Sequence, residues 1–402
     1  MKRLLYITVT APLGGPEAFV IPEMRCLARK GIDLTVIPLR PAGPITHLDG
    51  RPLLSRTLAT GPWSPQVWLA ALTWLCRAPA RVLGLLFLLL SRGRPGIRAK
   101  NLLVFPKALY IAAQAQRLRI NHIHAHWAST PSTCAMVAAA LAGVDWSFTA
   151  HRWDIGDDNL LAQKVSRSRF VRVISSLGYR RVAAVAGAGA HLKLALIPAG
   201  VALPEKMPPP RRPGGQPPVI TAVGSLTPVK GHRYLLRACR LLVDMGVDFR
   251  CLIVGAGPER RKLAEMIVKL GLGEAVTLAG ALPHHRVLAM LGAGAAGLLA
   301  HPSVETADGA HEGIPVAVME AMAHGVPVVV TRTGGLPELV DDETGLVVPP
   351  ADPGALARAI RELLADPVGA EARAVAARRR VSREFNLEKN VSRLLSRMEM
   401  HP

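Results

Sequence analysis

The order of the hydrophobic segments is the feature that most constrains the fold of this 402-residue chain. Short runs of Val, Ile and Leu alternate with longer segments of helical periodicity, and this alternation starts again in the second half. Alternating strands and helices predict a parallel sheet with helices packed on both faces. Because one hydrophobic core rarely supports more than about 250–300 residues, we expect two domains of this kind. The predicted fold class is therefore α/β, with two Rossmann-like, doubly wound parallel sheets.

The predicted elements follow from the two hydrophobic periods. Strands are expected in the first half at residues 4–9, 34–38, 122–126, 147–149, 170–174 and 193–197. Strands are expected in the second half at residues 219–223, 249–254, 276–278, 296–300 and 326–331. Helices are expected at residues 16–29, 100–119, 131–142, 231–245, 258–269, 284–291, 315–324 and 353–364. Since such sheets bind ligands at the carboxyl ends of their strands, two facing sheets would form a cleft between the domains.

A run rich in Pro, Gly and Arg separates the two alternating halves. Proline cannot continue a helix interior or a central strand, so residues 206–218 are predicted to be a stiff linker. The predicted domains are therefore residues 1–205 and 219–380. The end of the chain is Arg-rich and helical in pattern. Residues 381–402 are expected either to pack back on the first domain or to remain a solvated helix.

Composition indicates which classes of partner and which cellular compartment to expect for the chain. Its formal net charge of +20 favours anionic partners, such as lipid head groups, phosphorylated substrates or nucleic acid. Only 4% of the residues are aromatic and no zinc-finger or RRM-like motif occurs, which argues against nucleic-acid binding. The five cysteines are scattered without a CxxC pair. This pattern predicts a reducing cytoplasmic environment, without disulfides or a zinc site.

Two strongly apolar stretches, residues 68–75 and 82–90, leave two interpretations open. Arg77, Pro79 and Arg81 divide them, and neither stretch reaches the ~20 residues that a helix needs to span a bilayer. One interpretation is a pair of core or surface helices. The other is a membrane-associating segment over residues 63–100, with tryptophan and basic side chains at the level of the head groups.

The segment from Glu312 to Glu320 is the strongest functional motif in the chain. Pro315 favours the start of a helix, because its ring fixes φ and it lacks an N–H. Glu312 would then lie in the loop before the helix, and Glu320 about a turn and a half inside it. The free N–H groups at the helix start carry partial positive charge and favour an anion. The two acids are thus placed to hold the two ends of a substrate such as a nucleotide-sugar.

A second motif follows the first strand of the second half. Gly224 and Gly231 permit tight turns, and Lys230 can place its ammonium over a phosphate. By itself Lys230 would be interpreted as a surface lysine. The Glu312 segment favours the functional interpretation.

The candidate residues of the first half lie where predicted strands end. Gly14 and Gly15 follow the first strand, and they either form a simple tight turn or bring N–H groups close to a phosphate or an acceptor. Three alternating histidines at residues 122–126 share one face of a strand, but no acidic or cysteine partner accompanies them. No metal site is therefore predicted. His126 and His151 lie at strand ends, where a side chain can reach a ligand.

These motifs together resemble glycosyltransferase family 4, whose members are retaining, metal-independent enzymes of the GT-B fold. In the second half, the Glu312–Glu320 motif is followed by AMAHGVPVV at 321–329 and GGLPELV at 334–340. In the first half, PEAF at 16–19, HIHAHWASTP at 122–131 and FTAH at 148–151 resemble the branch that builds exopolysaccharides of the colanic-acid type. The resemblance covers nearly the whole chain. It implies an acceptor-side first domain and a nucleotide-sugar-binding second domain.

The resemblance also implies roles for individual residues. Glu312 would lie beside the donor sugar, Glu320 would bind the ribose hydroxyls, and Lys230 would neutralise the departing diphosphate. His151 would approach the donor sugar from the first domain. Further donor contacts would come from Gly224, Ser225, Gly313, Ile314, Pro315 and Val316. Acceptor or phosphate contacts in the first domain would come from Gly14, Gly15 and His126.

The predicted function is transfer of a hexose from a UDP- or GDP-sugar to a lipid-linked or polysaccharide acceptor in cell-surface polysaccharide biosynthesis. The enzyme would need no metal or other cofactor, and it would lie on the inner face of an anionic plasma membrane. The chain departs from the family pattern at Ser225, where an arginine usually shares the diphosphate with the lysine. This departure leaves two alternatives: a catalytically impaired GT-B protein that binds glycan or lipid, and a nucleotide-sugar epimerase of the same fold.

Overall fold

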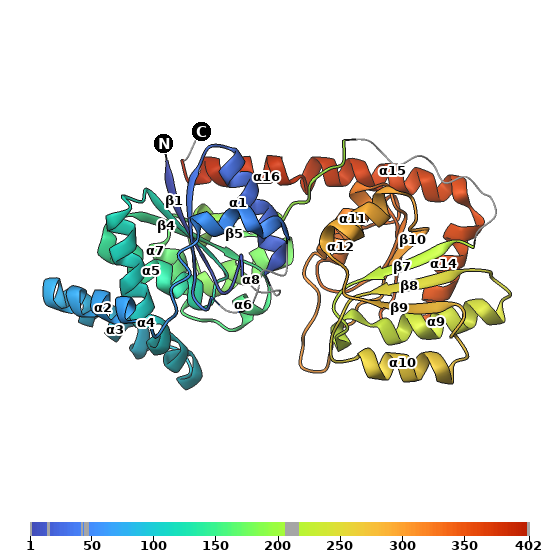
Figure 1. Cartoon of the computed structure of the whole chain (residues 1–402), viewed down its shortest axis with the longest axis horizontal. Coiled ribbons are helices and arrows are strands. Elements are labelled where there is room, and N and C mark those ends of the chain that lie inside the picture. Colours follow the sequence, from blue (N-terminus) through green and yellow to red (C-terminus); the bar gives the residue numbers. More distant parts are fainter. Residues whose placement is uncertain (1, 14–16, 42, 44–47, 206–216, 400–402) are drawn as a thin grey trace. The chain divides into compact units, whose positions relative to one another are not determined.

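A computed structural model describes residues 2–13, 17–41, 43, 48–205 and 217–399. These residues form two compact units (Figure 1). Unit 1 contains the described chain as far as Pro198 together with the residues from Leu387 onward, and unit 2 contains Ala199–Asn386. Each unit holds one sheet, which confirms the prediction of two doubly wound α/β units.

Unit 1 is built on a parallel sheet that has six strands among the described residues, in the order β2-β1-β3-β4-β5-β6. The strands are β1 (Arg3–Thr8), β2 (Asp33–Pro38), β3 (His122–His126), β4 (Asp145–Ala150), β5 (Phe170–Val173) and β6 (Leu194–Leu196). The helices are α1 (Ile21–Arg29), α2 (Pro65–Arg77), α3 (Pro79–Ser91), α4 (Pro95–Arg117), α5 (Thr130–Ala142), α6 (Trp153–Gly156), α7 (Leu161–Arg167), α8 (Ser176–Ala186) and α16 (Leu387–Arg397). The chain leaves β1 toward β2 and then crosses to β3 on the other side. This reversal places a switch point at the carboxyl ends of β1 and β3.

Unit 2 repeats the arrangement with the strand order β12-β11-β10-β7-β8-β9. The strands are β7 (Val219–Val223), β8 (Arg250–Val254), β9 (Val276–Gly280), β10 (Leu298–His301), β11 (Val328–Thr331) and β12 (Leu346–Val348). The helices are α9 (His232–Asp244), α10 (Arg260–Lys269), α11 (His284–Gly292), α12 (Val316–Ala323), α13 (Leu336–Leu339), α14 (Pro353–Ala365) and α15 (Pro367–Glu384). The order reverses between β7 and β10, so the switch point of unit 2 lies at the carboxyl ends of these two strands.

The hydrophobic pattern located most strands to within two residues. The strands predicted at 122–126 and 219–223 have the bounds of β3 and β7. β12 was not predicted, because three residues after a turn carry too little periodicity. The helical pattern at the end of the chain is broken at Phe385 and Asn386 into α15 and α16.

The division between the units corrects the predicted domain boundary. Residues 206–216 of the predicted linker lie outside the described residues, and the chain passes from unit 1 to unit 2 between Pro198 and Ala199. Residues 199–205 belong to unit 2 because they pair with the segment around α15: Val201 N donates to Phe385 O at 2.9 Å. The Pro-rich composition marked a segment that cannot form regular structure, which is not the same as the point where contacts divide.

The last helix belongs to unit 1. α16 begins at Leu387 and packs on α1, and its buried Val391 and Leu394 join a core cluster with Ile21 and Met24. The chain therefore crosses between the units a second time between Asn386 and Leu387, and not at residue 381.

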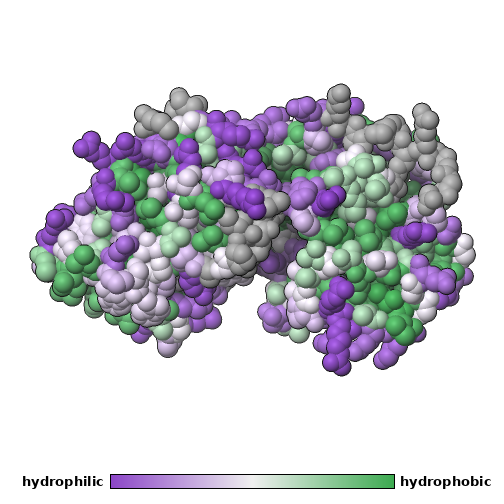
Figure 2. All heavy atoms as spheres, viewed as in Figure 1, coloured by the Kyte–Doolittle hydropathy of each residue, from purple (hydrophilic) through white to green (hydrophobic). Residues whose placement is uncertain are grey.

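No single helix in the described ranges is long and apolar enough to cross a membrane. α2 and α3 meet the length and composition criteria only when taken together, and they are bent by 114° at the break between them. Both helices pack against α4 at the margin of unit 1 (Figure 1). Figure 2 shows hydrophobic side chains at the surface of this end of the unit.

Candidate active site

The carboxyl ends of β7 and β10 bring the main candidates of the second half together. Lys230 follows β7 in a short 3-10 turn, and Glu312 follows β10. Lys230 Nζ lies 2.8 Å from Glu312 Oε1, and the two side chains are 16% and 9% exposed. Because a switch point opens a crevice outside the strand ends, this ion pair occupies the position where doubly wound sheets bind ligands.

Two glycines let the loops around this ion pair pack backbone against backbone. Gly231 has a φ of +66°, and a Cβ there would lie 1.9 Å from Pro302 O. Gly334 has a φ of +53°, and a Cβ there would lie 1.9 Å from Glu312 O. Neither position has room for a side chain, and both need the left-handed backbone that glycine adopts readily. The loops after β7 and β11 thus hold the loop that carries Glu312.

The residues around Lys230 give its side chain room and include two buried histidines. A Cβ on Gly224 would lie 3.1 Å from Lys230 Cε, so the lack of a side chain at Gly224 leaves space for the lysine side chain. His232 and His301 are buried nearby, and burial followed by the charge of Lys230 lowers their pKa values to about 4 and about 3. Both imidazoles are therefore neutral at pH 7 and add no positive charge beside Lys230.

Glu320 lies inside α12, as the sequence predicts. The helix begins at Val316, with Pro315 at its N-cap position, so Glu312 precedes it. Glu320 is 8% exposed, and its Oε1 lies 2.5 Å from Nε2 of His284, the first residue of α11. The imidazole fixes the direction of this carboxylate.

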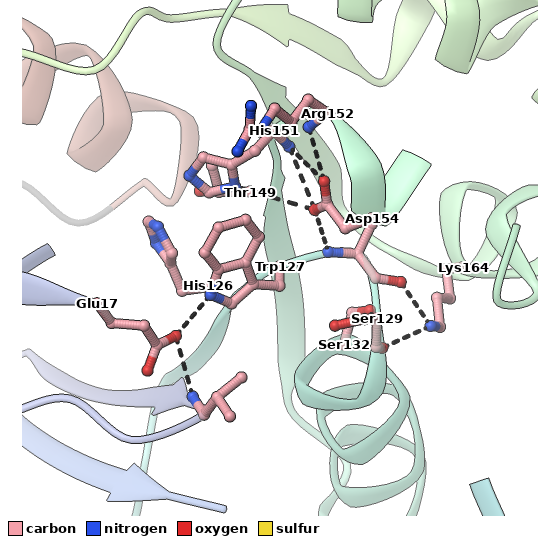
Figure 3. Close-up of polar contacts among 12 residues, drawn as sticks. Glu17, His126, Trp127, Ser129, Ser132, Thr149, His151, Arg152, Asp154 and Lys164 are labelled. Carbon is pink, nitrogen blue, oxygen red and sulfur yellow. Dashed lines mark hydrogen bonds and ion pairs between the residues drawn. The ribbon is translucent and has the colours of Figure 1, made fainter. Parts of the chain in front are cut away.

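In unit 1, the end of β4 carries His151 beside the buried carboxylate of Asp154 (Figure 3). Asp154 accepts hydrogen bonds from the backbone N–H groups of Ala128, His151 and Arg152, at 2.8–3.2 Å. Burial alone would raise the pKa of Asp154, but nearby His151 and the hydrogen bonds from Ala128 and Arg152 lower it. Nδ1 of His151 lies 3.9 Å from this carboxylate. Asp154 thus fixes the backbone at the end of the strand, and it places a negative charge beside the His151 ring.

A second carboxylate, Glu17, joins the loops after β1 and β3. It accepts hydrogen bonds from the backbone N–H groups of Val9, Thr10 and Ala11. It also accepts one from Nε1 of Trp127 (Figure 3). These donors lie at the switch point of unit 1. A phosphate could use them only by displacing Glu17, so they are structural donors here.

Aromatic rings cover the edge of unit 1 next to His151. The ring centroids of His126 and His151 are 4.5 Å apart, and Trp127 lies 4.2 Å from His151. Trp127 also stacks on Trp153 at 5.1 Å, and Trp153 is 48% exposed. Flat, partly exposed indole rings of this kind are suited to pack against an apolar or sugar-ring face.

The three histidines of β3 do not form a metal site. His122 Nε2 and His124 Nδ1 both lie within 2.8 Å of Ser147 Oγ, and His126 Nδ1 lies 3.0 Å from the hydroxyl of Tyr6. Burial lowers the pKa of His122 to about 4 and the pKa values of the other two well below the ordinary value. These rings act as neutral hydrogen-bonding groups.

The structure therefore brings some predicted residues together and separates others. Lys230 and Glu312 form one cluster in unit 2, together with Gly224 and the loop that runs from Gly313 and Ile314 into α12. Ser225 is exposed, and its Oγ lies 3.4 Å from Thr227 Oγ1. His126 and His151 form a separate cluster in unit 1. Gly14 and Gly15 lie outside the described residues.

Three residues of these clusters were missed from the sequence: His284, Asp154 and Glu17. Asp154 follows His151 by three positions, and that spacing was a usable signal. Glu17 follows the Gly14–Gly15 pair closely, but nothing local shows that it accepts four N–H groups. His284 belongs to another helix, so only the fold relates it to Glu320.

Comparison with known proteins finds a family match within unit 2. Residues 205–381 match the family of glycosyl transferases group 1. The putative colanic acid biosynthesis glycosyltransferase WcaL of Escherichia coli K12 is 44% identical over 167 residues, which are 41% of each chain. The amylovoran biosynthesis glycosyltransferase AmsK of Erwinia amylovora is 38% identical over 172 residues, which are 42% of each chain. These matches span about two fifths of the relatives' own length.

The likeness of the whole chain is structural. The Anabaena protein Alr3699/HepE, solved in complex with UDP, matches with a TM-score of 0.71 at 17% identity, over 99% of this chain and 100% of that chain. At this identity the likeness shows the fold alone. The GT-B fold that the resemblance implied is thereby confirmed.

Proposed function

We propose that this chain, whose residues 205–381 match the family of glycosyl transferases group 1, is a retaining glycosyltransferase of surface-polysaccharide biosynthesis. It would move a hexose from a UDP- or GDP-sugar to a lipid-linked or polysaccharide acceptor on the inner face of the plasma membrane. The observation that carries the proposal is the Lys230–Glu312 ion pair at the switch point of unit 2, directly before the start of α12.

The donor side of the proposal follows from the charges at this switch point. When the glycosidic bond to the donor phosphate breaks, negative charge develops on the leaving diphosphate. The Lys230 ammonium is held where such a group would lie, and the first N–H groups of α12 add partial positive charge. We assign Glu312 to the donor sugar and Glu320, oriented by His284, to the ribose hydroxyls. Since Lys230 supplies the charge, neither a metal nor another cofactor is part of the proposed reaction.

The acceptor side is assigned to unit 1. His151 and His126 present their rings at the end of the sheet, next to the exposed indole of Trp153. The names of the relatives, which refer to colanic acid and amylovoran, support a saccharide acceptor. We propose that Trp153 packs against the acceptor and that His151 contacts the sugar being transferred.

One observation favours a second function. The exposed Ser225 cannot replace the guanidinium that usually shares the diphosphate with the lysine. A protein that binds glycan or lipid without transferring sugar would tolerate this loss. We favour the enzyme, because Lys230, Glu312 and Glu320 keep the arrangement that binds a donor.

A donor screen tests the proposal. The full-length protein would be incubated with UDP- and GDP-hexoses and extracted membrane lipids, and release of nucleoside diphosphate and the glycosylated lipid would be measured. One donor is expected to be consumed, with its anomeric configuration retained in the product. Lys230→Ala should lower this release of nucleoside diphosphate. Its matched control is Lys269→Ala, which removes the same charge from an exposed site on α10. Absence of binding to both UDP and GDP by calorimetry would favour the second function.

A further inference from the structure

The outer face of α2 is apolar, although the helix lies at the surface of unit 1. Val67, Ala71 and Trp74 are buried against the core, as expected for an amphipathic helix. On the opposite side, however, Leu69 and Leu72 are 67% and 58% exposed. An ordinary surface helix carries polar residues on that side. α2 is therefore hydrophobic on both sides, and only one of them is covered by the unit.

α3 and the start of α4 continue this exposed apolar surface. Val82 and Leu89 of α3 are buried, whereas Phe87 is 73% exposed. Of the eighteen large hydrophobic side chains exposed in the described part of the chain, nine lie between residues 63 and 103. Such concentration marks an interaction surface, because single exposed apolar residues would be scattered. The surface is seen in part at the end of unit 1 in Figure 2.

The same region carries charge of one sign. The sequence has eleven Lys or Arg residues and no Asp or Glu between residues 50 and 144, although the chain contains 29 acidic residues. Arg77 and Arg81 are exposed on either side of the bend between α2 and α3, and Arg92 and Arg94 are exposed after α3. Apolar side chains bordered by unopposed arginines complement a surface that is apolar inside and anionic at its boundary.

We propose that α2, α3 and the start of α4 form a docking surface for an anionic lipid bilayer, which we call the α2–α3 surface. Its leucines and Phe87 enter the boundary between head groups and acyl chains, while the arginines stay with the lipid phosphates. Trp63 and Trp68, whose rings stack at 6.3 Å, are of the type enriched at that boundary. Neither helix reaches the ~20 residues needed to span a bilayer, and the 114° bend fits a pair that lies in the interface.

A bilayer explains this surface better than a second copy of the chain does. A two-fold interface brings the same patch of both copies together. It would therefore place the arginines of one copy against those of the other, and the stretch from residue 63 to 103 supplies no Asp or Glu to pair with them. Lipid phosphates supply the missing negative charge.

The inference deepens the proposed function by naming the surface that brings the enzyme to a lipid-linked acceptor. It can fail separately from that function. Vesicle binding requires no donor, whereas release of nucleoside diphosphate depends on Lys230 and Glu312 in unit 2.

Flotation of the full-length protein with vesicles tests the inference. We expect at least tenfold stronger binding to vesicles of phosphatidylcholine with one third phosphatidylglycerol than to phosphatidylcholine alone, and weaker binding as salt is added. The double substitution Leu72→Glu and Phe87→Glu should lower binding at least tenfold. The double substitution Arg77→Gln and Arg81→Gln should lower binding to anionic vesicles roughly fivefold for each arginine. Binding to neutral vesicles should change little.

The matched control is Leu192→Glu with Val268→Glu, which adds the same charges at side chains that are 75% and 78% exposed outside this region. Its binding should stay within twofold of the wild type, and the thermal unfolding midpoint should be unchanged in all variants. Equal binding to neutral and anionic vesicles would overturn the proposal. So would undiminished binding of the Leu72/Phe87 variant, or sedimentation showing a dimer that this variant abolishes.

Discussion

The two units each hold an ion pair near the strand ends of their sheets, and the pairs differ in how completely their polar atoms are satisfied. In unit 1, Arg172 pairs with Glu23 and also donates to the carbonyls of Ile197 and Pro198. Glu23 also accepts a hydrogen bond from the hydroxyl of Tyr6 at 2.7 Å. Arg172 is 1% exposed. This pair leaves no side that a ligand could approach.

The ion pair of unit 2 is simpler and more accessible. The Lys230 ammonium has three N–H donors and contacts Glu312 at 2.8 Å, and its side chain is 16% exposed. A compact ammonium on a flexible stem can also exchange one acceptor for another more easily than a planar guanidinium fixed by carbonyls. We infer that the buried Arg172–Glu23 pair, whose guanidinium makes three hydrogen bonds, supports unit 1. The more accessible Lys230–Glu312 pair at the switch point is the one that we propose for ligand binding.

Removing Arg172 should have the largest effect on stability. Arg172→Ala leaves the Glu23 carboxylate buried without its cation and removes the donors to two carbonyls. We expect it to cost about 3–5 kcal/mol of unfolding free energy. All six tryptophans lie in unit 1, so urea unfolding followed by tryptophan fluorescence reports on that unit alone. Arg180→Ala, an exposed site on α8, should cost no more than about 0.5 kcal/mol. A small cost for Arg172→Ala would mean that the Arg172–Glu23 pair does not stabilise unit 1.

Removing either member of the unit 2 pair should affect turnover and leave unit 1 unchanged. Lys230→Ala and Glu312→Ala should each lower kcat by about 10²–10³-fold, because each removes charge stabilisation at the leaving diphosphate or the sugar. Release of nucleoside diphosphate measures the loss. Far-UV circular dichroism checks that unit 2 stays folded, because the tryptophans report on unit 1 alone. Wild-type turnover in either variant would withdraw the role assigned to that residue.

Altering His284 should have a smaller effect that is confined to donor binding. Its Nε2 lies 2.5 Å from Glu320, so His284→Ala frees the carboxylate that we assign to the ribose. We expect the KM for the donor to rise about tenfold, roughly the worth of one hydrogen bond to a charged group, with kcat changed much less. His284→Gln, which keeps an N–H donor, should recover part of the loss. A fall in kcat without a change in KM would show that Glu320 does not contribute to binding the donor before it reacts.

The same comparison explains what the sequence could predict. The switch-point residues Lys230 and Glu312 lie in the loops that follow two apolar strands, so the order of strands and helices is enough to place them at one edge of one sheet. Arg172 and Glu23 could not be paired in this way. Arg172 sits within β5 and Glu23 within α1, and their contact depends on how α1 packs over the sheet.

The domain boundary was missed for a similar reason. Composition predicts where a helix or strand cannot continue, but contacts decide which unit holds the neighbouring residues. Val201 bonds to Phe385, which lies close to the second crossing between the units. A pairing between segments so far apart in the chain leaves no local pattern.

The smallest effect that we expect is a loss of stability of unit 1 at low pH, caused by His122. Burial is the first cause that lowers the pKa of His122 in unit 1, to about 4 from an ordinary 6.5. As the pH falls below 6.5, the unfolded chain binds a proton that the folded chain does not bind. Stability is therefore lost as the pH falls from 6.5 to about 4, and it is fully present above 6.5. His122→Gln can keep a hydrogen bond to Ser147 and does not titrate.

This variant should lose about 1 kcal/mol less unfolding free energy than the wild type when the pH is lowered from neutral to about 5.5. Urea unfolding at the two pH values, followed by tryptophan fluorescence, measures the difference in unit 1. His122 lies in β3, in a different unit from Lys230 and Glu312, so kcat at neutral pH should be unchanged. An equal loss of stability in the wild type and the variant would mean that His122 is protonated in the folded chain. His122 would then not be the neutral hydrogen-bonding group of β3 that its burial indicates.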